Sequence, residues 1–85
     1  MFTIEYTRDA AKALKNMPRT TAVLIMKKIE LLAADPFALN NNVKKLVNRP
    51  ECRLRVGDWR VLYALHEGRL VIEVIRIAPR GGAYQ

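Results

Sequence analysis

The sequence has 85 residues and a net charge of +7, from 15 Lys and Arg against 8 Asp and Glu. This length predicts one small domain over residues 1–85, with room for a groove rather than a deep pocket. The single cysteine excludes an intrachain disulfide, and no apolar run approaches the ~18 residues of a membrane helix. We therefore expect a cytoplasmic protein with a polyanionic partner, nucleic acid first, and no membrane partner.

The N-terminal part predicts a strand followed by two helices. Residues 2–6 alternate apolar and polar, as a half-buried strand does. Thr7 suits the N-cap of a helix that ends at residues 16–18. A second helix opens at Pro18, carries an apolar stripe at helical spacing and stops at Asp35-Pro36. Together the two helices form a predicted αα-hairpin.

The C-terminal part predicts three strands after a loop. The loop covers residues 37–43, and the strands cover residues 52–56, 59–66 and about 70–77. We therefore expect an α+β fold with the order β-α-α-β-β-β. In this fold the helical hairpin packs on one face of a mostly antiparallel four-stranded sheet, and the opposite face stays open.

Arginines concentrate around a predicted tight turn. Gly57-Asp58 between two β-rich runs is a two-residue hairpin signal. With these residues as the loop, Arg55 lies opposite Arg60, and the period of two puts Arg53 on the same face. Like charges across a strand pair cost stability, so we expect an anion between the guanidinium groups. Phosphate is the anion that fits them best.

Further basic and aromatic residues flank this predicted cluster. Lys44 and Lys45 lie beside the arginine strand and are predicted proton or phosphate contacts. The second hairpin turn, near residues 67–69, has two or three residues, which leaves open whether Arg76 shares the arginine face. Arg80 leaves the sheet at a glycine hinge, and Tyr84 is a candidate stacking surface for a nucleobase.

The residue content excludes several chemistries. One histidine and one cysteine, without a ligand-like acidic cluster, argue against a metal site, and we expect no cofactor. No serine is present for a triad, and Cys52 and His66 are expected on opposite sheet faces. Gly81-Gly82 is too short for a phosphate-cradling loop. RNA cleavage by its own 2′-hydroxyl survives, because it needs oriented cations and two proton transfers.

Three segments together resemble the RelE-like toxins of the RelE/ParE toxin–antitoxin superfamily. They are Lys45-Leu46, residues 53–63 and residues 79–84, and the similarity covers nearly the whole chain. The resemblance implies a type II toxin that is a ribosome-dependent endoribonuclease. Such a toxin cuts messenger RNA in the A site by metal-independent attack of the 2′-hydroxyl and so inhibits translation.

The resemblance also implies roles for individual residues. Arg60 would stabilise the transition-state phosphate, Arg80 would assist the leaving oxygen, and Tyr84 would stack on or orient a base. Arg53 and Arg55 stand where the family often has basic residues for phosphate binding or proton removal. The predicted catalytic residues are therefore Arg55, Arg60, Arg80 and Tyr84, and the predicted RNA-binding residues are Lys44, Lys45, Arg53 and Arg76.

Partners follow from the same resemblance. They are a RelB-like antitoxin that wraps the toxin with a helix and a strand, the ribosome with its messenger RNA, and operator DNA contacted through the antitoxin. Two other functions stay open. One is ParE-like inhibition of DNA gyrase, which shares the fold without nuclease residues, and the other is a non-catalytic RNA-binding relative.

Overall fold

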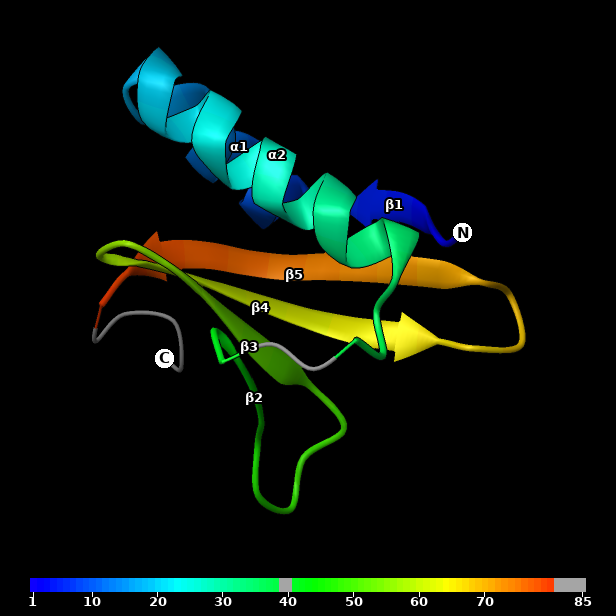
Figure 1. Cartoon of the computed structure of the whole chain (residues 1–85). Helices are drawn as coiled ribbons and strands as arrows, with labels where there is room; N and C mark the ends of the chain where they lie inside the picture. The colour runs from blue at the N-terminus through cyan, green and yellow to red at the C-terminus, as the bar shows by residue number, and fades with distance from the viewer. Residues whose placement is uncertain (39–40, 81–85) are drawn as a thin grey trace.

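The computed structural model describes residues 1–38 and 41–80, which form two helices on one side of a mixed β-sheet (Figure 1). Along the chain the elements are β1 (Thr3–Tyr6), α1 (Arg8–Asn16), α2 (Arg19–Ala34), β2 (Val43–Lys45), β3 (Cys52–Val56), β4 (Trp59–His66) and β5 (Val71–Pro79). The five strands lie in the order β1-β5-β4-β3-β2. β1 is parallel to β5, and the other neighbouring strands are antiparallel.

The predicted α+β class is confirmed, but the predicted count of four strands is wrong. The additional strand is β2, which pairs antiparallel with the first residues of β3 and forms one edge of the sheet. It has three residues, too few to show the alternation that identifies a strand in a sequence. The last strand also runs further than predicted, as far as Pro79, a position at a strand end that does not need a backbone donor.

Thr7 fixes the start of α1 and ties it to the sheet. Its Oγ1 accepts a hydrogen bond from the Ala10 backbone N–H at 3.1 Å and donates one to the Ile75 carbonyl at 2.6 Å. The first bond satisfies an N–H that has no partner within the helix. Both predicted helices are confirmed, and the second begins directly after Pro18 and ends before Asp35.

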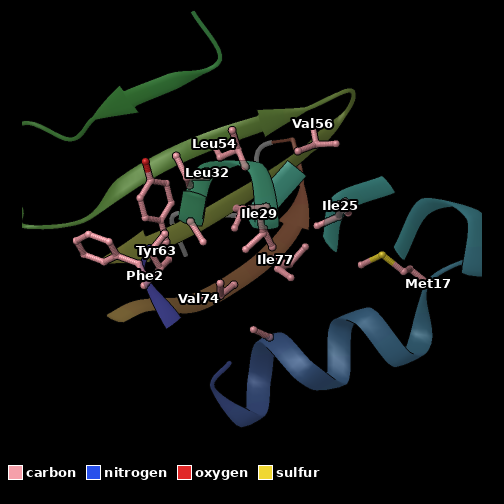
Figure 2. Close-up of a cluster of buried hydrophobic side chains, with 14 residues drawn as sticks. Phe2, Met17, Ile25, Ile29, Leu32, Leu54, Val56, Tyr63, Val74 and Ile77 are labelled. Atoms are coloured by element: carbon pink, nitrogen blue, oxygen red, sulfur yellow. The ribbon is translucent and has the colours of Figure 1, made fainter. Parts of the chain in front are cut away.

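The hydrophobic core lies between the helices and the sheet (Figure 2). Ile25 and Ile29 of α2 belong to the same buried cluster as Val61 and Tyr63 of β4, and all four side chains are at most 1% exposed. Burying an aliphatic or aromatic side chain of this size contributes about 1.5–3 kcal/mol each. Because the apolar side chains of the sheet gather on this face, the alternate residues of β3 and β4 face the side without helices.

The β3–β4 hairpin has the predicted turn and register. Gly57 occupies the first central position with φ +59°, a left-handed conformation that favours glycine. Arg55 pairs with Arg60, as the sequence predicted. The carbonyl of Asp58 accepts a hydrogen bond from the Arg80 backbone N–H at 2.7 Å, so the turn is also fixed to the end of β5.

Neither helix in the described parts of the chain is long and apolar enough to cross a membrane.

Candidate functional site

A cationic groove lies on the sheet face opposite the helices. It has a volume of about 410 Å³. Its lining residues are Asn41, Asn42, Lys44, Arg53, Arg55, Arg60 and Arg80, and we refer to this set as the arginine groove. Five of the eight predicted site residues are therefore brought together in one concave surface.

Strand register explains why these side chains meet. Arg55 of β3 lies directly across from Arg60 of β4, and Lys44 of β2 lies directly across from Arg53. Side chains at paired positions point to the same side of a sheet, so the two pairs form adjacent rows. Arg80 joins them because its backbone N–H is held by the β3–β4 turn.

Neutral oxygens hold two of the arginine side chains. Arg55 donates from Nη2 and Nε to the Oδ1 atom of Asn42, at 3.0 and 3.3 Å. Arg60 donates from Nη1 to the carbonyls of Gly57 and Trp59, both at 3.0 Å. A guanidinium has five N–H donors, so these bonds orient each group, keep its charge and leave donors for an anion.

The close spacing of the cations has an electrostatic cost. Partial desolvation, and then the positive charges of the neighbouring arginines with Arg53 first, lower the pKa of Arg60. The Asp58 carboxylate acts in the opposite direction. The fold therefore concentrates like charge at one place, and an anion bound there would relieve the repulsion.

Three predicted site residues lie outside the arginine groove. Lys45 pairs with Cys52, so it faces the helix side of the sheet, where it lines a different hollow with Phe37. Alternation along β2 thus separates it from its neighbour Lys44. Tyr84 lies outside the described residues.

The register of β5 answers the question about Arg76. Arg76 pairs with Leu62, which in turn pairs with Arg53, so Arg76 shares the arginine face. A bulge between the Leu62 and Tyr63 pairs leaves Ile75 unpaired and restores the alternation that puts Val74 in the core. Arg76 is therefore on the arginine face, in the same cross-strand row as Arg53, but Leu62 separates the two and Arg76 does not line the groove.

Cys52 and His66 lie on opposite faces, as predicted. Cys52 pairs with Tyr63 on the helix side, and burial, followed by the thiol of Cys52, raises the pKa of the Tyr63 hydroxyl. His66 has its Nε2 atom 2.9 Å from Oε1 of Glu73. Over residues 1–38 and 41–80, no three His, Cys, Asp or Glu side chains gather closely enough to hold a metal ion.

Asn41 and Asn42 are groove residues that the sequence prediction did not name. The available signal was a run of three asparagines, residues 40–42, which only Val43 separates from Lys44 and Lys45. An amide side chain beside arginines supplies a hydrogen-bond acceptor without negative charge, which is what an anion-binding surface requires of its supporting residues.

Comparison with known proteins gives the family. The model described as "ParE toxin of type II toxin-antitoxin system, parDE" matches residues 4–84. The chain is 29% identical over 86 residues to the protein named "Putative toxin RelE1" from Methanocaldococcus jannaschii, covering 99% of this chain and 96% of that protein. The chain therefore belongs to the ParE toxin family of type II toxin–antitoxin systems.

Solved structures confirm the predicted RelE-like character. The toxin fold matches the archaeal RelE–RelB complex from Pyrococcus horikoshii with a TM-score of 0.81 and 26% identity, covering 96% of this chain and 98% of that chain. The isolated RelE toxin of E. coli matches in fold with a TM-score of 0.81, at 14% identity, covering 99% of this chain and 89% of that chain.

Proposed function

We propose that this toxin is a ribosome-dependent endoribonuclease that cuts messenger RNA in the A site and so inhibits translation. The observation that carries the proposal is the arginine groove, in which Arg55 and Arg60 are held by neutral oxygens and keep their charge. Such a surface is suited to a phosphodiester whose negative charge increases during reaction. Membership of a type II toxin family is consistent with an activity that inhibits translation.

The proposed reaction uses a nucleophile that RNA itself supplies. The 2′-oxygen attacks the adjacent phosphorus and loses its proton, the bond to the 5′-oxygen breaks, and that oxygen gains a proton. The products are a 2′,3′-cyclic phosphate and a 5′-hydroxyl. Arginines are poor proton carriers because their pKa is so high, so their contribution is to bind and stabilise charge. The proton transfers then require a group beyond the arginines.

Each predicted site residue has a proposed part in this reaction. Arg60, with Arg55 directly across from it, would stabilise the transition-state phosphate. Arg80 would assist the leaving oxygen, and Tyr84 would stack on a base. Lys44 and Arg53 form the next row and would bind the RNA backbone. Arg76 and Lys45 are proposed as outer RNA contacts, because neither lines the groove.

The proposed partners include an antitoxin. Solved relatives of this fold include RelE–RelB complexes, from Pyrococcus horikoshii among others, and these support a RelB-like antitoxin for this toxin. The ribosome and messenger RNA would be its targets. Operator DNA would be contacted through the antitoxin, and the site of action would be the cytoplasm.

The test is translation in a cell-free system with primer-extension mapping of the messenger. We expect breaks at codons in the A site, with 5′-hydroxyl ends, and a parallel loss of protein synthesis. The same messenger without ribosomes is the control and should stay intact. Intact messenger with full protein synthesis at toxin concentrations above the ribosome concentration would contradict the proposal.

A second candidate is inhibition of DNA gyrase. The observation in its favour is the family model itself, which is described by the ParE toxin. A supercoiling assay separates the two activities. Loss of supercoiling at low toxin concentration without messenger cleavage would favour gyrase. Binding of RNA by wild type with neither activity would instead identify a non-catalytic relative.

A further inference from the structure

A second hollow adjoins the arginine groove around the tip of the β3–β4 hairpin. Its volume is about 470 Å³, and it reaches from the hairpin to helix α2. It shares Asn42, Arg55, Arg60 and Arg80 with the groove and adds Lys28 of α2 and Asp58 of the turn. We refer to it as the hairpin hollow. The cationic surface is therefore not confined to the open sheet face and continues to the helix layer.

We propose that the hairpin hollow is a second phosphate subsite, which binds a neighbouring phosphate of the same RNA strand, with Lys28 as its contact on α2. The inference rests on the proposed function, because it takes the ligand of the arginine groove to be RNA. It adds a direction to that function, since the strand would run from the open sheet face around the hairpin toward α2.

Charge balance supports more than one phosphate. A phosphodiester carries one negative charge, whereas five cationic side chains line the arginine groove and Lys28 adds a sixth. One bound phosphate would leave most of this charge uncompensated. The only carboxylate among the six hollow residues named above is Asp58, so the hollow stays net positive beside the groove.

Shared arginines make the two sites neighbours. Arg60 lines both, and its Nη1 atom is fixed at the turn by the Gly57 carbonyl. Arg55 also lines both, with its guanidinium held by Asn42. Because a guanidinium presents donors in several directions within its plane, one arginine can contact two adjacent phosphates. Consecutive phosphates of one strand are the polyanion that matches this arrangement.

The chain contains a matched pair of lysines for the test. Lys27 and Lys28 are adjacent on α2 and both are exposed. Of the two, Lys28 lines the hairpin hollow, since successive helix residues point about 100° apart. Replacing either lysine changes the net charge of the protein equally, so a difference between the variants reports position.

The experiment measures binding of 2′-O-methyl RNA, which lacks the nucleophilic hydroxyl, by wild type, Lys28→Ala and Lys27→Ala. One ligand is a dinucleotide with a single phosphate, and the other has about eight nucleotides. We expect Lys28→Ala to weaken the longer RNA about fivefold and to reduce the slope of log K against log salt by about 0.7. The dinucleotide should bind both variants like wild type, and Lys27→Ala should leave the longer RNA within about twofold.

Each outcome decides between the two proposals. Equal effects of the two substitutions on the longer RNA, or an equal effect of Lys28→Ala on both ligands, would overturn the second subsite. Messenger cleavage combined with either result would leave the proposed function intact. A selective effect of Lys28→Ala in a toxin that does not cut messenger RNA would support the subsite and reject the nuclease function. Equal thermal unfolding of the two variants verifies that both are folded.

Discussion

Basic side chains on the open face of the sheet have different kinds of partner at its two ends. At the β1–β5 end, carboxylates are the partners: an Arg69 nitrogen lies 3.4 Å from Glu5, and His66 Nε2 lies 2.9 Å from Glu73. Arg69 lies in the turn between β4 and β5 and Glu5 lies in β1, whereas His66 and Glu73 lie in the paired strands β4 and β5. Such pairs satisfy a basic side chain within the protein itself.

At the β3–β4 end, Arg55 and Arg60 have neutral partners. Arg55 donates to an asparagine side chain, and Arg60 donates to backbone carbonyls of its own turn. These bonds fix the position of the guanidinium groups without cancelling their charge. The type of partner, rather than the number of cations, therefore distinguishes the end that we propose binds an external anion.

The largest effect, on messenger cleavage, should come from removing an arginine at the β3–β4 end. Arg60→Ala should lower messenger cleavage in a translating extract about 10²–10³-fold, because it withdraws a donor from the charge that develops on the phosphate. Arg69→Ala removes an arginine from the β1–β5 end and should leave cleavage within about twofold of wild type. Equal losses in the two variants would show that overall charge, and not the groove, controls the activity.

An intermediate effect, on RNA affinity, should follow from giving Arg55 a carboxylate partner like those at the β1–β5 end. Asn42→Asp places a carboxylate on the Arg55 guanidinium and converts a neutral contact into an ion pair. We expect RNA affinity to fall about tenfold, because the new charge competes with phosphate for Arg55. Asn42→Ala removes the same hydrogen bonds without adding charge and should reduce affinity by less. Binding titrations at fixed salt compare the RNA affinities of the two variants. A loss in Asn42→Asp no larger than that in Asn42→Ala would contradict the prediction.

The smallest effect should be on stability. Arg60→Gln removes a like-charge pair across β3 and β4 and should raise Tm by about 2–4 °C. Arg69→Gln breaks a contact with a carboxylate and should leave Tm unchanged or slightly lower. Thermal unfolding followed by circular dichroism measures both shifts. A fall in Tm for Arg60→Gln would mean that its bonds to the turn outweigh the repulsion.

The predictable part of this fold depends on neighbouring residues. The Gly57-Asp58 turn and the period of two determine the Arg55–Arg60 pair from a few adjacent positions, so the sequence sufficed. The Thr7 cap of α1 is equally local, since it accepts a hydrogen bond from Ala10, three residues later. The predicted cluster of arginines on one face was therefore confirmed, while the catalytic roles of its members stay predictions.

The unpredicted part depends on contacts between distant segments. β2 is recognised as a strand by its pairing with β3, and without that pairing the opposite orientations of Lys44 and Lys45 do not follow. The bond from Arg55 to Asn42 joins residues 13 positions apart. Lys28 lines the hairpin hollow because α2 packs beside the hairpin, a result of tertiary packing that no local pattern of lysines predicts.

The two hydrogen bonds of the Thr7 hydroxyl also bear on the order in which parts of the protein fold. Its hydroxyl reaches Ile75, 68 residues later, and β1 is a parallel neighbour of β5. Contacts of such high sequence separation slow folding, because a long chain must close before they form. During synthesis from the N-terminus, β1 therefore cannot pair within the sheet until β5 has been made. The toxin gains its finished surface only after the residues of β5 have been made.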